Sequence, residues 1–247
     1  MRIGLLSSIN HPLLPHFIKE ALARGLDDLV VLCDSINFSE KNQRIWHDRT
    51  GDNFDTGGKY HVSLHDFPQT QIPLYCVGNH NGEGCQNTIK SAEVDILLNA
   101  GTPRRLMKDT ICAAPLGALN VHPGILPKYR GSSAVEWSIL NDDPVGHTAH
   151  FMTENYDEGP IIAVHECALP KIADYEKVRV TIYQTTCRLA AQTLVEIQAG
   201  IHTFAKATVQ DSSKAQVWPP ISDEKLALVK KKLEQGHYHY LGTDRNM

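Results

Sequence analysis

The sequence predicts an α/β fold built on a Rossmann-like, mostly parallel sheet, and three observations support that prediction. Short segments that are apolar at successive positions, as in strands buried on both faces, alternate with helical patterns along the chain. The chain opens on a strand–helix–strand unit, for which a right-handed crossover is expected. Polar side chains also follow several of the strands, where open α/β sheets bind their ligands.

The expected elements follow from the hydrophobic pattern and its interruptions. We expect strands over residues 2–6, 29–33, 74–77, 94–99, 117–122, 147–152 and 160–167. Helices are expected over 13–24, 85–92, 174–199 and 222–235, with shorter ones beginning at Arg104 and following the loop after 122. Residues 35–59 are polar and predict a long surface loop with one short helix.

Length and composition predict the organisation and the compartment. The 247 residues suit a catalytic domain over 1–205 and a C-terminal extension with one helix over 206–247. The net charge of -4 argues against a nucleic-acid partner, and no apolar run reaches membrane-spanning length. Six scattered cysteines without a C-x-x-C pair indicate reduced thiols, so we expect a cytoplasmic protein. The extension either completes a homodimer or covers the sheet edge.

The stretch from Leu119 to Ile162 carries the chemistry. Asn120 and His122 are two apart on a strand, so both side chains point to the same side as a donor pair for a developing oxyanion. Asp157 follows the next strand, and a parallel arrangement would bring it beside His122 to orient the ring and relay a proton. No G-x-S-x-G elbow is present, which favours direct acyl transfer. The structural alternative is that the Pro-Gly and Asp-Glu-Gly-Pro segments are plain turns.

The segment N-V-H-P-G-I-L-P-K-Y-R-G resembles the signature of formyltransferases that use 10-formyltetrahydrofolate. G-H-T-A-H-F-M-T-E-N-Y-D-E-G-P-I-I resembles their second signature, and D-I-L-L-N-A-G-T-P-R-R-L their folate-pocket strand. The resemblance covers residues 95–162 and implies the formyltransferase fold with 10-formyltetrahydrofolate as co-substrate. It implies that Asn120 and protonated His122 hold the formyl oxygen, that Asp157 moves the proton, and that His150 is a supporting or structural residue.

The same resemblance implies which residues bind the folate, and other residues near the site are expected to bind the acceptor. The folate pocket would be lined, largely through backbone groups, by Arg104, Arg105, Leu106, Glu154, Asn155 and Tyr156. Contacts to the acceptor are expected from Ser8, Asn10, Gly124, Tyr129 and Arg130. The alternatives are a helix cap for Ser8 and Asn10 and a loop anchor for Tyr129 and Arg130.

The acceptor is inferred by excluding other members of the family that the sequence resembles. The first loop, S-S-I-N-H-P, lacks the glycines of the glycinamide ribonucleotide enzymes, and little chain follows Gly200 to form the extra domain of the methionyl-tRNA enzymes. The formyltetrahydrofolate hydrolases carry an N-terminal domain, whereas the first strand here begins at Arg2. What remains is a small-molecule amine, namely an amino sugar linked to a nucleotide. A glycinamide ribonucleotide formyltransferase and a non-catalytic folate-binding relative remain as alternatives.

A metal enzyme is the third functional class that the sequence raises, because the chain has 13 histidines. His147 and His150 lie three apart on an expected strand and therefore face opposite sides. No three-ligand cluster with supporting residues is apparent, so we expect no metal.

Overall fold

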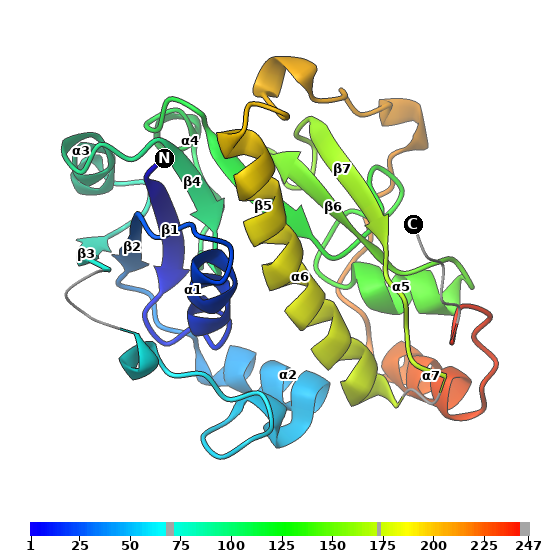
Figure 1. The fold of residues 1–247 in the computed structure, drawn as a ribbon. Coiled ribbons are helices and arrows are strands. Elements are labelled where there is room, and N and C mark those ends of the chain that lie inside the picture. The colour runs from blue at the N-terminus through cyan, green and yellow to red at the C-terminus, as the bar shows by residue number, and fades with distance from the viewer. Residues whose placement is uncertain (68–71, 172–173, 243–247) are drawn as a thin grey trace.

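The computed structural model describes residues 1–67, 72–171 and 174–242, and a seven-stranded sheet runs through its centre (Figure 1). The strands are β1 (Ile3–Ser8), β2 (Leu29–Asp34), β3 (Leu74–Gly78), β4 (Ile96–Asn99), β5 (Ala118–His122), β6 (Gly146–Phe151) and β7 (Ile161–Glu166). Their spatial order is β3-β2-β1-β4-β5-β6-β7, and the first five in this order run parallel. The predicted Rossmann-like, mostly parallel sheet is confirmed.

Helices cover both faces of the sheet. They are α1 (Leu14–Leu22), α2 (Glu40–Thr50), α3 (Glu83–Ser91), α4 (Lys108–Ile111), α5 (Ala134–Leu140), α6 (Tyr175–Gln198) and α7 (Asp223–Glu234). In Figure 1, α1 and the long α6 cross the near face of the sheet, and both contribute to one hydrophobic cluster with β1, β2 and β4. Residues of α3 and α4 form a second cluster against the opposite face.

The strand β1 shows why these segments are apolar at successive positions. All six of its residues are buried. Leu5 packs into the cluster under α1 and α6, and its neighbour Leu6 packs into the cluster under α3. Because successive side chains of a strand point to opposite faces of the sheet, a strand between two helical layers needs apolar residues on both faces.

The arrangement of the last two strands corrects one expectation. β6 runs antiparallel to β5, and β7 antiparallel to β6, so Asp157 does not follow a parallel strand. The antiparallel register instead places His150 directly opposite Asn120. Cross-strand partners in an antiparallel pair have closely spaced side chains, and this pairing brings the two signatures together.

Residues 35–59, expected to be a long surface loop with one short helix, are mostly exposed, but more of them are helical than expected. This segment forms α2 and a 3-10 helix, η1 (Gly51–Phe54), and buries Trp46 and Phe54. Trp46 packs on Phe54 and on Tyr183 of α6. The segment is polar overall, so its two large apolar side chains, Trp46 and Phe54, were not predicted to be buried. Their burial stabilises a helix that would be marginal in isolation.

The short helix expected at Arg104 is also wrong, because α4 begins only at Lys108. The side-chain amide of Asn81 hydrogen-bonds to the backbone between Arg104 and Lys108 through both its nitrogen and its oxygen. Its Nδ2 donates to the carbonyl oxygen of Arg105 at 2.9 Å, and its Oδ1 accepts from the backbone N–H of Met107 at 2.8 Å. Backbone groups that a helix would have paired internally are therefore satisfied by a side chain.

The C-terminal segment returns across the domain as a strap, which we define as residues 206–221. Thr208 pairs with Ile161 at the edge of β7, and Val217 pairs with Arg130. Beyond the strap, Val229 and Leu233 of α7 join the hydrophobic cluster that contains α5. Residues 243–247 of the expected extension lie outside the described part of the chain. Among the described helices, none has the length and apolar character that crossing a membrane requires.

Candidate active site

A cavity of about 180 Å³ lies where β4, β5 and β6 meet the loops that follow β4 and β6. It is lined by Asn99, Thr102, Pro103, Arg104, Arg105, Leu106, Asn120, His150, Met152, Thr153, Glu154, Asn155, Tyr156 and Asp157. The cavity therefore gathers two of the three predicted catalytic residues and all six residues predicted for folate. It opens at the carboxyl ends of β4 and β5, where parallel strands place their ligand sites.

The amide of Asn120 is held at both ends. Its Nδ2 lies 3.0 Å from Nε2 of His150, and its Oδ1 accepts from Nδ2 of Asn99 at 3.0 Å. Burial lowers the pKa of His150 to about 4, so the ring is neutral near pH 7. The second proton of the Asn120 amide remains available to a group in the cavity.

Asp157 connects the two predicted signatures. Asp157 adopts a left-handed backbone conformation (φ 56°), which is uncommon outside glycine. Its Oδ2 accepts from the backbone N–H of Gly131 at 2.9 Å, while its Oδ1 lies 3.4 Å from Nδ1 of His122 and 3.9 Å from Nε2 of His150. A strained backbone held by several partners is typical of functional sites.

His122 is placed behind this carboxylate, and does not line the cavity. Its side chain is 6% exposed, and its Nε2 donates to the carbonyl oxygen of Tyr129 at 2.7 Å. Gly124 packs so closely that an added Cβ would come within 2.6 Å of Nε2 of His122. The structure thus brings Asn120, His122 and Asp157 into one cluster, while only Asn120 and Asp157 reach the cavity. A direct contact from His122 to a ligand there would require its ring to leave Tyr129.

Two arginines shape the cavity wall. The Nε of Arg104 donates to Oδ2 of the buried Asp34 at 2.6 Å. Burial opposes ionisation of Asp34, but this bond and those from the N–H groups of Ile36 and His80 outweigh it and lower its pKa. Arg105 donates to the carbonyl oxygen of Glu154 and to Oδ1 of Asn155, and thereby joins the loops after β4 and β6.

Ser8 and Asn10, which were predicted to contact the acceptor, hydrogen-bond to neighbouring backbone groups in this structure. Ser8 is buried, and its N–H donates to the carbonyl oxygen of Gly101 at 3.3 Å. Asn10 accepts from the N–H of Phe38 at 2.7 Å, and neither residue caps α1, whose N-cap is Leu13. Ser8 is the last residue of β1, and Asn10 lies in the loop between β1 and α1.

Tyr129 and Arg130 anchor their loop, as the structural alternative held. The Tyr129 ring is 1% exposed, stacks on Trp218 of the strap, and donates its hydroxyl to Asp143. Arg130 is paired with Glu158 at 2.9 Å and with Oε1 of Gln210 at 2.8 Å. Only the Tyr129 carbonyl touches the catalytic cluster, through His122.

A second cavity adjoins the first. It measures about 550 Å³ and shares Met152, Thr153 and Glu154 with the smaller cavity. Much of its lining is apolar, including Ile111 and Phe204. Together the two cavities fall in the size range of small-molecule sites, which combine an apolar body with a few placed polar groups.

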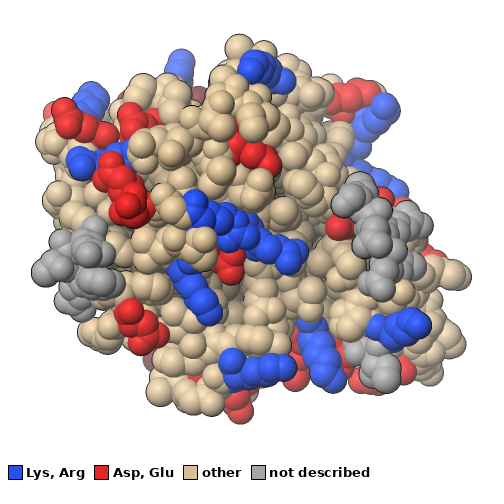
Figure 2. Space-filling model, viewed as in Figure 1, with Lys and Arg blue, Asp and Glu red and all other residues tan. Residues whose placement is uncertain are grey.

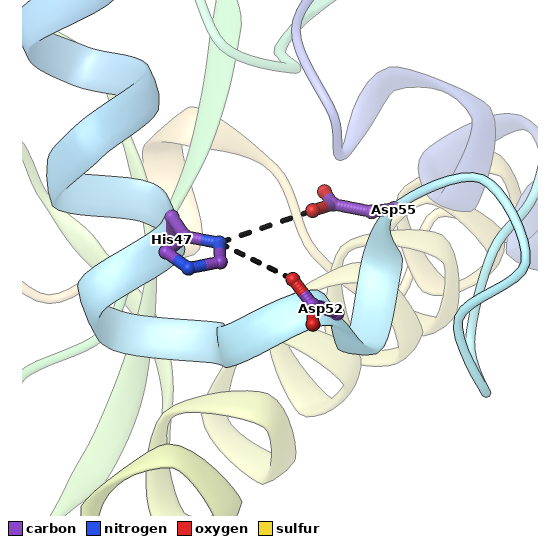
Figure 3. Close-up of side chains that lie close together, drawn as sticks. All are labelled: His47, Asp52 and Asp55. Atoms are coloured by element: carbon purple, nitrogen blue, oxygen red, sulfur yellow. Dashed lines mark ion pairs between the residues drawn. The ribbon is translucent and has the colours of Figure 1, made fainter.

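One group of potential metal ligands occurs among the described residues. Figure 3 shows His47, near the end of α2, facing Asp52 and Asp55 at 3.5 and 3.9 Å from its Nδ1. All three are exposed, and none lines the cavity that contains Asn120. The other histidines raised by the sequence are engaged elsewhere: Nε2 of His147 lies 3.1 Å from the carbonyl oxygen of Ile182, and His150 faces Asn120.

Two residues of the site were not found from the sequence. Asn99 ends β4 beside Asn120 on the neighbouring parallel strand, and the polar ending of an otherwise apolar strand was an available signal. Gln210 donates from the strap to the carbonyl oxygens of Asp157 and Gly159. No local pattern marks a contact between residues that are 53 positions apart.

Comparisons with known proteins give two kinds of sequence match. Residues 68–197 match the family model described as formyl transferase. The methionyl-tRNA formyltransferase of Desulfotalea psychrophila is 31% identical over 130 residues, which are 52% of this chain and 39% of that protein. This chain therefore spans well under half the length of that curated relative.

Solved structures share the fold at low sequence identity. An N-formyltransferase from Helicobacter canadensis, in complex with folinic acid and dTDP-3-aminofucose, is 14% identical with a TM-score of 0.59, covering 88% of this chain and 70% of that one. Glycinamide ribonucleotide transformylase 1 from Symbiobacterium toebii is 22% identical with a TM-score of 0.56, covering 85% and 93%.

Proposed function

Because the chain belongs to the formyl transferase family, we propose that it transfers the formyl group of 10-formyltetrahydrofolate to an amine of a small metabolite. The observation that carries this proposal is the connected cluster of Asn120, His150 and Asp157 at the wall of the cavity, with His122 behind Asp157. It provides an amide donor and a carboxylate within reach of one bound group, which is what direct acyl transfer to an amine requires.

In this mechanism the acceptor amine attacks the formyl carbon and a new C–N bond forms. The carbonyl electron pair moves to oxygen, and the free N–H of Asn120 stabilises that negative charge. Asp157 takes the proton that the attacking nitrogen loses and returns it to the folate nitrogen as the old C–N bond breaks. His122 holds the carboxylate in place and can donate to it when the ring carries two protons.

Room for the folate is supported by the two adjoining cavities. The polar one contains Arg104, Arg105 and Leu106, which the family resemblance assigns to the folate, and the larger one extends from it along apolar residues. A structural neighbour was solved with folinic acid, a related compound. These observations support 10-formyltetrahydrofolate as the donor and call for no metal in the transfer.

For the acceptor we favour an amino sugar linked to a nucleotide. The Helicobacter canadensis neighbour was solved with dTDP-3-aminofucose, and the first loop of this chain lacks the glycines expected of a phosphate-binding turn. The runner-up is glycinamide ribonucleotide, the acceptor named for the Symbiobacterium toebii neighbour. A non-catalytic folate-binding relative is less well supported, because the whole cluster around Asp157 is present and connected.

The test is a panel of amines incubated with 10-formyltetrahydrofolate and the purified protein, with release of tetrahydrofolate followed by absorbance and the formylated product by mass spectrometry. The panel contains several amino-sugar nucleotides, glycinamide ribonucleotide and methionyl-tRNA. Formylation of an amino-sugar nucleotide supports the proposal. Formylation of glycinamide ribonucleotide alone overturns the sugar assignment, and folate release without any amine would indicate a hydrolase.

A further inference from the structure

We propose that Asn99 is a positioning residue that fixes the direction of the Asn120 amide, so that an N–H and not the oxygen faces the reacting formyl group. The inference rests on the function proposed above. A primary amide has two orientations of nearly equal shape, which differ by exchange of its oxygen and nitrogen. In the flipped orientation, the oxygen would repel a developing oxyanion, so the direction of this amide decides whether the site is competent.

The orientation of Asn99 follows from backbone groups whose polarity is fixed. The N–H groups of Gly101 and Thr102 point at its side chain, at 3.2 and 3.0 Å, and only its Oδ1 can accept from them. Its Nδ2 must then face the other way, toward Asn120, where it lies 3.0 Å from Oδ1. Asn99 therefore presents a donor to Asn120, and the Asn120 atom that accepts from this donor must be its Oδ1.

A second chain of reasoning, from the opposite side, reaches the same orientation. The Nδ1 of His150 lies 3.0 Å from the carbonyl oxygen of Phe151, which can only accept. Nδ1 therefore carries the proton, and Nε2 of the neutral ring is left as an acceptor 3.0 Å from Nδ2 of Asn120. Asn120 is held between a donor and an acceptor, and only one of its two orientations satisfies both.

Asn99 is the member of this chain that can be altered most selectively. Exchange of Asn99→Asp keeps an oxygen for the N–H groups of Gly101 and Thr102, so the loop after β4 is retained. It removes the N–H that faces Asn120 and places a negative charge there. Asn120 is then expected to flip toward the new carboxylate and to turn its oxygen into the donor position.

The first readout is steady-state kinetics with the best amine of the panel. At pH 8 we expect Asn99→Asp to lower kcat about 100-fold, the scale of losing one oxyanion donor, while KM for 10-formyltetrahydrofolate changes less than about threefold. Asn79→Asp is the matched control: Asn79 also accepts a backbone N–H, from Asn81 at 2.9 Å, but has no contact with Asn120. Its kcat should equal that of the wild type. A wild-type kcat for Asn99→Asp at pH 8 overturns the proposal.

The second readout is the pH dependence of the loss. At pH 5.5 a larger share of the new carboxyl is protonated and can donate to Asn120 again, so the ratio of variant to wild-type kcat should rise about tenfold from pH 8. A ratio that is the same at both pH values would point to a structural defect and overturns the proposal. The other titratable groups near this amide are present in both proteins, so comparison with wild type at each pH removes their common contribution. They are His11, His80, Arg104, Arg105, His122, His150, Glu154, Tyr156 and Asp157.

A third readout does not depend on turnover. In protein labelled with nitrogen-15 at asparagine, the side-chain NH2 signals of Asn120 are identified by their loss in Asn120→Asp. They should shift in Asn99→Asp at pH 8, move back at pH 5.5, and stay unchanged in Asn79→Asp. Unshifted signals in Asn99→Asp overturn the inference about Asn99. A wild type that formylates no amine defeats the proposed function instead, and the two failures are thereby distinguished.

Discussion

Gln210 holds the backbone that begins at Asp157, although it lies 53 residues from Asp157 in the chain. Its Nε2 donates to the carbonyl oxygen of Asp157 at 2.9 Å and to that of Gly159 at 2.8 Å. Its Oε1 accepts from Arg130, which in turn pairs with Glu158. The strap therefore keeps the left-handed conformation of Asp157 that no local sequence enforces.

Replacement of Gln210 by leucine should weaken the site without removing any group that meets substrate. Two carbonyl oxygens lose their donor, and Asp157 is expected to relax toward an ordinary conformation. We expect kcat to fall about tenfold, equivalent to about 1.4 kcal/mol of transition-state stabilisation, with a smaller effect on KM. Gln192→Leu, on the exposed part of α6, is the control. An unchanged kcat in Gln210→Leu would contradict a positioning role for the strap.

Asn120→Ala should abolish most activity. The substitution removes the amide N–H that faces the cavity, and loss of one oxyanion donor typically costs a factor of 100 or more in kcat. Initial rates with saturating folate and amine measure the effect, and the thermal midpoint shows whether the fold persists. Turnover at the wild-type rate would eliminate Asn120 as the oxyanion donor.

Arg105→Ala should affect binding more than chemistry. Arg105 joins the loops on two sides of the cavity through Glu154 and Asn155, so its removal leaves the folate site less organised. The expected result is a rise of about tenfold in KM for 10-formyltetrahydrofolate with kcat within about threefold of wild type. The exposed Arg188 supplies the control substitution. A tenfold fall in kcat at unchanged KM would assign Arg105 to the chemical step instead.

Stability should fall in mild acid because histidines are buried in neutral form. Burial lowers the pKa of His147 from 6.5 to about 3, so between these values the unfolded chain binds a proton that the folded chain does not. The free energy of unfolding therefore decreases as the pH falls through this window. From pH 7 to pH 5.5, His147 should contribute about 1 kcal/mol to the loss.

Urea unfolding of His147→Gln at the two pH values measures that contribution, because glutamine cannot titrate. The variant should lose about 1 kcal/mol less than wild type between pH 7 and 5.5. His237→Gln, at an exposed position, should keep the full pH dependence. Equal pH dependence of all three proteins would show that His147 is not a source of acid sensitivity.

The buried ion pair between α5 and α6 should be costly to break from one side. Glu136 is fully buried, with Nη1 of Arg179 at 3.6 Å, Nε of Arg49 at 3.8 Å and the Tyr175 hydroxyl at 2.6 Å. Burial opposes ionisation of Glu136, but its two arginines prevail and lower its pKa. Arg179→Met leaves this carboxylate short of a partner and should destabilise the protein by about 3 kcal/mol.

A double variant separates the effect of the Glu136–Arg179 ion pair on stability from the effect of leaving one charge unpaired. Glu136→Leu combined with Arg179→Met removes both buried charges and should recover much of the lost unfolding free energy, as measured by urea titration. The exposed pair of Lys177 and Asp174 is the comparison, and Lys177→Met should remain close to wild type. If the double variant is less stable than Arg179→Met alone, buried charge is not the cause of the loss.

The sequence predicted the sheet and the first half of the site because those features are local. Apolar runs identified all seven strands, and the spacing of Asn120 and His122 on β5 placed both in the cluster. The direction of β6 was missed, because strand polarity depends on the path of the loop between strands. The antiparallel register, which sets His150 opposite Asn120, is a tertiary feature of that kind.

Features that depend on distant partners were beyond sequence reasoning. Trp46 and Phe54 are isolated apolar residues in a polar segment, and the contact of Trp46 with Tyr183 of α6 joins parts of the chain that are far apart in sequence. Tyr129 and Arg130 looked available for substrate, but residues of the strap and Asp143 occupy their side chains. On the face of the molecule seen in Figure 2, Lys and Arg side chains lie interspersed with Asp and Glu.

The position of the strap in the chain also determines when the contacts of Asp157 can form during protein synthesis. A ribosome delivers the chain in order, so Asn120, His122 and Asp157 emerge before Gln210 does. At 5–20 residues per second, the 53 residues between Asp157 and Gln210 take about 3–10 s to synthesise. During that interval the nascent chain contains Asn120, His122 and Asp157 without the hydrogen bonds from Gln210, and those bonds can form only after residue 210 has been translated.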